Sequence, residues 1–164
     1  DFVVCLNPGG NWLPKRWPVE YFAQLADLLI KEFKAKIVIT GSDNDLKLAS
    51  TLATMMSHRA AILCGKTNLK QLGALFKLTK LVVSADSGPL HIAAALNAQA
   101  IAVFGPTSPS ITGPYNEDNA IVIRKDIGCE IPCYVVKCND SRCMKAITPE
   151  DVVEKVRSLI SITP

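Results

Sequence analysis

Short apolar runs alternate along the chain with longer segments in which apolar residues recur every three or four positions. Nearly continuous apolar runs are typical of parallel strands buried on both faces of a sheet, and the recurring spacing is typical of amphipathic helices. The alternation therefore predicts an α/β fold with a doubly wound, Rossmann-like parallel sheet. The predicted strands are residues 2–6, 37–40, 61–64, 81–84, 101–104 and 120–124, and the predicted helices are residues 18–33, 44–57, 69–76, 89–96 and 149–161.

Two polar loops follow the first and fourth predicted strands, at residues 7–17 and 85–91. In the common strand order 3-2-1-4-5-6 these two strands are neighbours, and ligands bind in the crevice outside their carboxyl ends. The same two loops are the richest in Gly, Pro and polar residues. Topology and composition therefore predict one binding site between them.

Length and composition indicate a single globular domain without a membrane span. The 164 residues are about one domain, and 49% hydrophobic with 20% charged residues describes an ordinary globular chain. The longest apolar stretch, residues 92–104, is interrupted by Asn97 and Gln99 and is shorter than the roughly 18 residues of a membrane span. The chain begins without Met or a leader pattern, so we expect an excised or trimmed domain.

The charge is too balanced to indicate a nucleic-acid partner. Eighteen basic residues face fifteen acidic ones, for a net charge of +3, and no basic stretch is interleaved with aromatics. The chain also contains no phosphate-binding loop of the Gly-x-x-x-x-Gly-Lys-Ser/Thr type and no Gly-x-Gly-x-x-Gly after a strand. Nicotinamide cofactors and nucleoside-triphosphate hydrolysis are therefore disfavoured.

The segment Asp86-Ser87-Gly88-Pro89 leads from a predicted strand into a predicted helix. Free N–H groups and the positive dipole at a helix N-terminus favour an anion such as a diphosphate. His91 lies in the first turn, where a neutral ring can donate a hydrogen bond to a phosphate oxygen. The alternatives are that Ser87 or Asp86 only caps the helix, and that His91 is a satisfied core residue.

Other side chains could complete such a site. Lys15 and Arg16 stand in the opposite loop, where a lysine can place its charge on a phosphate or can simply be solvated. Asp43 and Asp45 follow the second strand, and either can accept hydrogen bonds from a ribose or cap a helix. The Gly- and Pro-rich loop 105–115 carries Thr107, which can meet phosphate or sugar, or the loop is only a rigid spacer.

Four of the six cysteines, Cys129, Cys133, Cys138 and Cys143, lie in a predicted cysteine-rich loop over residues 125–147. Four thiols are enough for a structural zinc or an iron–sulfur site, although a paired Cys-x-x-Cys is absent. Two disulfides are a rival that fits a cytosolic setting poorly. We expect free or partly oxidised thiols, with a structural zinc as the alternative.

Several motifs, taken in order along the chain, carry a resemblance to a known family. They are Asn7-Pro8-Gly9, Lys15-Arg16-Trp17-Pro18, Gly41-Ser42, Asp86-Ser87-Gly88-Pro89-Leu90-His91-Ile92-Ala93-Ala94-Ala95-Leu96 and Gly105-Pro106-Thr107-Ser108-Pro109. In these motifs the chain resembles glycosyltransferase family 9, the heptosyltransferases of lipopolysaccharide core assembly. The resemblance implies that residues 1–164 are one nucleotide-sugar-binding domain, the C-terminal half of a GT-B enzyme whose N-terminal acceptor domain is absent.

The resemblance also implies an activity and its residues. The full enzyme would transfer heptose from ADP-heptose to the lipopolysaccharide inner core, with inversion and without a metal ion. The glycolipid acceptor and the general base would belong to the missing half, so the isolated chain would bind the donor without turnover. Lys15 and His91 would stabilise the leaving group. The implied substrate-binding residues are Asn7, Lys15, Asp43, Thr67, Asp86, Ser87, Gly88, His91 and Thr107.

The resemblance further implies a cytoplasmic protein with peripheral contact to the inner membrane. Two alternatives come from other classes of protein. The domain could be a stand-alone nucleotide-sugar-binding or regulatory module, or the cysteine loop could be a metal-dependent interaction site.

Overall fold

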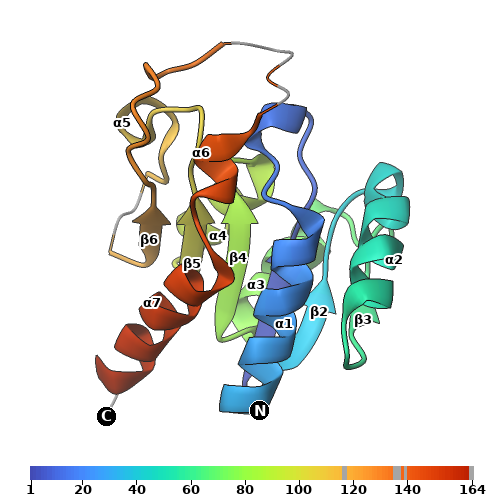
Figure 1. The fold of residues 1–164 in the computed structure, drawn as a ribbon. Coiled ribbons are helices and arrows are strands. Elements are labelled where there is room, and N and C mark those ends of the chain that lie inside the picture. The colour runs from blue at the N-terminus through green and yellow to red at the C-terminus, as the bar shows by residue number, and fades with distance from the viewer. Residues whose placement is uncertain (116–117, 135–137, 139, 163–164) are drawn as a thin grey trace.

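Six parallel strands form one sheet in the order β3-β2-β1-β4-β5-β6 (Figure 1). The structure is a computed structural model that describes residues 1–115, 118–134, 138 and 140–162. Every neighbouring pair of strands is parallel, which confirms the predicted doubly wound α/β fold and its strand order. The strands are β1 (Val3–Asn7), β2 (Lys36–Ile39), β3 (Ala61–Ile62), β4 (Leu81–Ala85), β5 (Ala100–Val103) and β6 (Ala120–Ile123).

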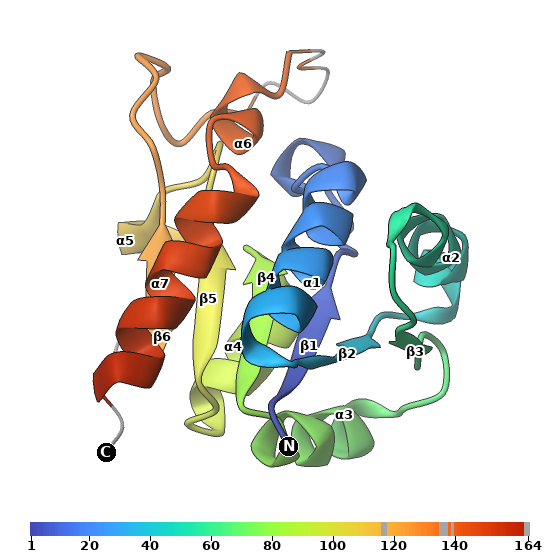
Figure 2. The same cartoon turned by 60° about the horizontal axis from the view of Figure 1, so that its bottom comes forward.

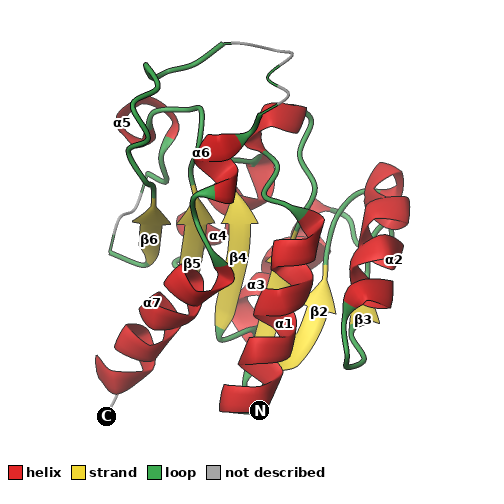
Figure 3. Cartoon of the chain, in the orientation of Figure 1, coloured by secondary structure: helices red, strands yellow, loops and turns green. Residues whose placement is uncertain are grey.

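Helices cover both faces of the sheet (Figures 2 and 3). Helices α1, α2 and α7 pack on one face and α3 and α4 on the other, which gives two separate apolar clusters. Successive side chains of a strand point to opposite faces, so Val4 and Leu6 enter the first cluster while Cys5 enters the second. The helices are α1 (Val19–Phe33), α2 (Leu46–Met55), α3 (Leu69–Leu78), α4 (Gly88–Ala95), α5 (Pro109–Thr112), α6 (Arg142–Lys145) and α7 (Pro149–Ile162), with short 3-10 helices η1 (Leu13–Lys15) and η2 (Asp43–Asp45).

The short elements were not predicted. Helix α5 lies in the Gly- and Pro-rich loop, and α6 lies in residues 125–147, so the prediction of a loop throughout that range was wrong. A helix of four residues is about one turn long and cannot show the three-and-four spacing that marks a helix in a sequence. Positions 135–137 and 139 of the predicted cysteine-rich loop lie outside the described residues.

The loop after β1 is anchored to the far end of the chain. Trp17 is buried just before α1, and its indole Nε1 donates a hydrogen bond of 2.9 Å to the Ile147 carbonyl. The ring also meets Phe22 edge to face, with 4.9 Å between the centroids. These contacts hold the loop over the carboxyl end of β1, where Lys15 projects.

Candidate functional site

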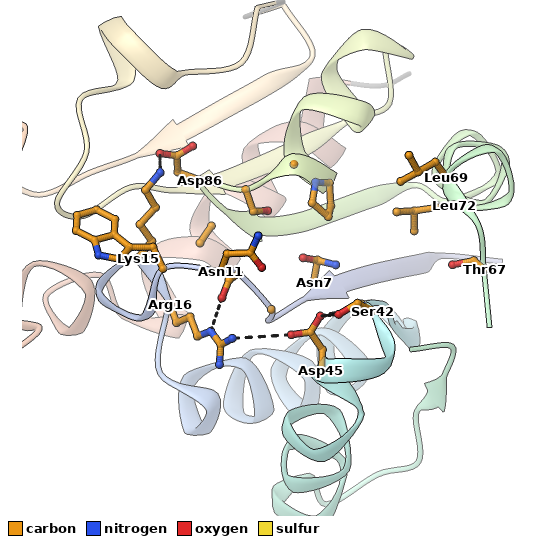
Figure 4. A pocket seen from close by; sticks show the side chains of 18 of the residues that line it. Asn7, Asn11, Lys15, Arg16, Ser42, Asp45, Thr67, Leu69, Leu72 and Asp86 are labelled. Atoms are coloured by element: carbon orange, nitrogen blue, oxygen red, sulfur yellow. Dashed lines mark hydrogen bonds and ion pairs between the residues drawn. The ribbon is translucent and has the colours of Figure 1, made fainter. Parts of the chain in front are cut away.

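A cleft of about 480 Å³ opens at the carboxyl ends of β1, β2 and β4 (Figure 4). It lies where the strand order reverses, between β1 and β4, as the topology predicted. Four segments that are far apart in the sequence form its walls. The lining residues are Asn7, Gly9, Gly10, Asn11, Trp12, Lys15, Arg16, Gly41, Ser42, Asp45, Thr67, Asn68, Leu69, Leu72, Ala85, Asp86, Ser87, Gly88 and Pro89.

The N-terminus of α4 opens into one end of this cleft. Ser87 is the N-cap residue, but its hydroxyl lies 2.8 Å from the Ser84 hydroxyl and makes no capping hydrogen bond within the described residues. A Cβ atom added at Gly88 would meet nothing within 4 Å, so the backbone there is open. Pro89 has no N–H, and the Leu90 N–H donates to the Ser87 carbonyl at 3.1 Å, so the first turn of α4 presents the Gly88 N–H and the positive end of the helix dipole to a ligand.

A buried carboxylate stands beside that helix end. Asp86 Oδ2 accepts hydrogen bonds from Lys15 Nζ at 2.7 Å and from Thr112 Oγ1 at 2.9 Å. The Asp86 side chain is 5% exposed and that of Lys15 is 24% exposed, so the pair is largely shielded from solvent. His91 Nε2 lies 3.8 Å from Asp86 Oδ1, and its side chain is 46% exposed. The Lys15 ammonium is thus held at the cleft wall by Asp86 (Figure 4).

A second carboxylate, that of Asp45, lies at the other end of the cleft. Its Oδ2 accepts hydrogen bonds from the Ser42 backbone N–H at 2.9 Å and from the Ser42 hydroxyl at 2.6 Å. Arg16 NH2 lies 4.0 Å from Asp45 Oδ1, and Arg16 Nε donates to the Gly10 carbonyl at 2.8 Å. This end of the cleft therefore has a hydrogen-bond acceptor held in place, the Asp45 carboxylate, next to the Arg16 guanidinium.

The structure brings six of the predicted substrate-binding residues to the cleft and leaves three outside its lining. The six are Asn7, Lys15, Thr67, Asp86, Ser87 and Gly88. Asp43 packs against the Gly65 backbone, and His91 lies one turn into α4. Thr107 is buried and lines a neighbouring cavity.

The sequence did not show which of Asp43 and Asp45 lines the cleft, and the structure places Asp45 there. Asp45 was one of two candidates there, and its sequence signal was the Ser42-x-x-Asp45 spacing of a capping box, which fixes the carboxylate toward the loop. Asn7 lines the cleft floor, but its amide already donates to Thr40 O at 3.1 Å and to Thr40 Oγ1 at 3.2 Å. The chemistry of the cleft is therefore that of two acidic and two basic side chains around an open helix end.

The four clustered cysteines line another cavity of about 220 Å³, together with Arg142. All six cysteines of the chain are free. Within the described residues, no group of three or more His, Cys, Asp or Glu side chains is placed to hold a metal ion, so the structural zinc considered above is not supported. Burial raises the pKa of the Cys143 thiol.

The strand order and the cleft at its point of reversal define the class of Rossmann-like nucleotide-binding folds. The family model described as glycosyltransferase family 9 (heptosyltransferase) matches residues 1–142. The chain belongs to this family, which confirms the resemblance seen in its motifs.

Relatives and solved structures agree with this assignment. The chain is 35% identical to lipooligosaccharide heptosyltransferase 2 of Haemophilus influenzae, covering 97% of this chain and 47% of the relative. The structure of E. coli ADP-heptose lps heptosyltransferase II is 33% identical, with a TM-score of 0.83 over 96% of this chain and 46% of that one. The crystal structure of the glycosyl transferase family 9 from Veillonella parvula is 28% identical, with a TM-score of 0.85 over 97% and 46%.

The chain spans about half the length of the relatives that it matches. The match confirms the predicted fold class, the C-terminal half of a GT-B glycosyltransferase. None of the helices in the described part of the chain is long and apolar enough to cross a membrane.

Proposed function

We propose that this domain binds ADP-heptose in the cleft between β1 and β4, as the donor-binding half of a glycosyltransferase that transfers heptose to the lipopolysaccharide inner core. The observation that carries the proposal is the open N-terminus of α4 beside the Lys15–Asp86 pair, at the switch point of the sheet. Its relative from E. coli at 33% identity is named for ADP-heptose.

The diphosphate is assigned to the end of the cleft at Gly88. The Gly88 N–H and the Ser87 hydroxyl would donate to its oxygens, the positive end of the α4 dipole would face it, and Lys15 would supply a positive charge. His91, on the exposed side of the same turn, would donate a hydrogen bond from its neutral ring. Asp86 would hold Lys15 and orient the donor.

The nucleoside is assigned to the other end of the cleft. The Asp45 carboxylate lies at that end and would accept hydrogen bonds from ribose hydroxyls, with Asn7 on the floor beside it. Thr67 and the Leu72 side chain would border the adenine. A ribose contact by Asp43 stays a prediction, although Asp43 does not line the cleft.

Transfer with inversion needs a base on the acceptor and positive groups at the departing diphosphate. We assign only the second task to this domain, through Lys15, His91 and the α4 N-terminus. Because fixed donors already face the leaving group, we propose a metal-independent reaction. The base and the glycolipid site would lie in the other half of the enzyme, at the cytoplasmic face of the inner membrane.

Calorimetric titration with ADP tests the nucleotide site. We expect Lys15→Ala to weaken ADP binding by about 10-fold or more, because a charged hydrogen bond contributes roughly 1.5–3 kcal/mol. His91→Ala should weaken it by a smaller factor of about 3 to 10, as a hydrogen bond from a neutral ring does. Matched controls are Lys36→Ala, whose ammonium pairs with Asp1 at 2.8 Å, and His58→Ala, whose ring lies beside Asp27.

Equal effects of the site and control variants would contradict the assignment of the diphosphate to this end of the cleft. A transfer assay with a lipid A-type acceptor tests whether the catalytic base lies in the other half of the enzyme. Heptose transfer by the 164-residue chain alone would refute that proposal. Donor binding without transfer, by a gene product no longer than this chain, would instead favour the stand-alone binding module.

A further inference from the structure

The Asp86 carboxylate is shared by two donors from different parts of the chain. Its Oδ2 atom accepts a hydrogen bond of 2.7 Å from the Lys15 ammonium and one of 2.9 Å from the Thr112 hydroxyl. Lys15 belongs to η1, in the loop after β1, and Thr112 is the last residue of the short helix α5, after β5. One buried oxygen therefore joins two loops that are far apart in the sequence.

Lys15 and Thr112 are the two groups that satisfy this carboxylate. Within the part of the chain that the structure describes, no other group donates a hydrogen bond to it. His91 Nε2 lies 3.8 Å from Asp86 Oδ1, which is too long for a hydrogen bond. The Asp86 side chain is 5% exposed, so solvent is poorly placed to replace a lost partner.

A nucleotide in the cleft changes the partners of Asp86. Under the proposed function, a diphosphate at Gly88 draws the Lys15 ammonium toward its oxygens. A buried carboxylate that loses its cation destabilises the state in which this happens. A hydrogen bond to an ionised group is stronger than one between neutral groups, so a donor that stays on Asp86 reduces this penalty.

The Thr112 hydroxyl can be this remaining donor because its own position does not depend on Lys15. The Thr112 backbone N–H donates to the Ser108 carbonyl at 3.0 Å, within the turn that forms α5. The hydroxyl lies 2.9 Å from Asp86 Oδ2 and 3.4 Å from the Ser108 carbonyl, so Asp86 is the nearer acceptor. Movement of the ammonium would therefore leave the bond from Thr112 to Asp86 in place.

We propose that Thr112 is a positioning residue that keeps Asp86 hydrogen-bonded while Lys15 turns to the diphosphate. In the free domain the carboxylate has both donors, and in the nucleotide-bound domain it keeps Thr112. Thr112 lies outside the lining of the nucleotide cleft and acts through the ammonium that reaches into it. The inference rests on the proposed function, because it needs a phosphate group within reach of Lys15.

Calorimetric titration of the 164-residue chain with ADP tests this role. Thr112→Val removes the hydroxyl with little change of shape. It should weaken ADP binding by about 3- to 10-fold, less than Lys15→Ala does, because Lys15 must then stay on Asp86 or leave it without a donor. Thr112→Ser keeps the hydroxyl and should bind ADP within about 2-fold of the wild type. Thr112→Ala takes the place of the valine variant if that variant does not fold.

The matched control is Thr79→Val. Its hydroxyl is also half-buried, but it donates to the Phe76 carbonyl of its own helix and lies outside the cleft lining. This variant loses the same chemical group at a place that does not contact Asp86, so it should bind ADP as the wild type does.

Two further measurements separate a positioning role from a purely structural one. Adenosine lacks the diphosphate, so its affinity should be the same in Thr112→Val as in the wild type, whereas general damage to the cleft would weaken both ligands. In an Asp86→Asn background the side chain has no charge to leave unpaired. Adding Thr112→Val there should change ADP affinity by less than about 2-fold.

The outcomes distinguish this inference from the function on which it rests. If the wild type does not bind ADP, or if Lys15→Ala binds it as tightly as the wild type, the proposed nucleotide site is wrong and the role of Thr112 falls with it. If Lys15→Ala weakens ADP binding but Thr112→Val does not, the positioning role alone is overturned. Equal losses in Thr112→Val and Thr112→Ser, equal losses of ADP and adenosine, or an undiminished loss in the Asp86→Asn background would also overturn it.

Discussion

The carboxylate of Asp45 reaches the cleft only because two glycines leave room for it. A Cβ atom on Gly9 would lie 2.6 Å from the Asp45 carboxyl carbon, and one on Gly41 would lie 2.8 Å from the Asp45 Cβ. Both distances are far below normal contact, so any larger residue at these positions would displace the carboxylate. Glycine at two separate loops thus fixes the place of one acidic side chain.

The position of Asp45 leads to a prediction at the residue scale. Asp45→Asn should weaken ADP binding by about 10-fold, because a neutral amide oxygen is a poorer acceptor for ribose hydroxyls than a carboxylate. Asp43→Asn should change ADP affinity by less than about 2-fold, since Asp43 lies outside the cleft lining. Calorimetry measures both. A larger loss in Asp43→Asn would restore Asp43 as the ribose partner.

Among the secondary-structure elements, the long ones could be predicted from the sequence and the short ones could not. Helix α1 repeats its apolar pattern over several turns, so its register and buried face follow from spacing alone. Helix α5 is four residues long, yet it supplies Thr112, which bonds Asp86. The cleft position followed from topology, but which of Asp43 and Asp45 lines the cleft depends on loop packing that no periodic pattern encodes.

The hydrogen bond from Trp17 to the segment just before α7 gives a prediction at the element scale. Trp17→Phe removes the indole donor and leaves the Ile147 carbonyl unpaired, which should lower the free energy of unfolding by about 1–3 kcal/mol. Urea denaturation followed by circular dichroism measures this loss. Trp12→Phe makes the same chemical change at a half-buried ring in the cleft wall and should cost less. Equal losses would mean that the hydrogen bond to Ile147 does not stabilise the fold.

Taken as a whole, the molecule has one thiol at the centre of the sheet and another near its edge. Cys5 lies on β1 and is fully buried, and Cys64 is 3% exposed. Burial raises the pKa of Cys5 to about 12 and that of Cys64 to about 11, from an ordinary value of 9.0. Because the unfolded thiols ionise first, these groups make the fold less stable as the pH rises from about 9 toward 12.

This arrangement predicts two classes of thiol reactivity in the folded chain. At pH 8 the four partly exposed cysteines should react with a disulfide reagent without denaturant, Cys143 more slowly than the others because burial raises its pKa, and Cys5 and Cys64 should react only when the chain unfolds. Absorbance of the released thiol, followed across a urea series, measures both rates. Rapid reaction of all six thiols without denaturant would contradict the burial of Cys5 and Cys64 in the folded chain.

The bond between Lys15 and Asp86 means that the cleft already contains its own counter-ion. A phosphate that approaches the ammonium has to replace the aspartate or share the ammonium with it, so binding is an exchange of one anion for another. A small ion gains little from such an exchange, whereas a nucleotide adds contacts along the rest of the cleft. Under the proposed function, the pair would therefore favour a nucleotide over a small anion at this site.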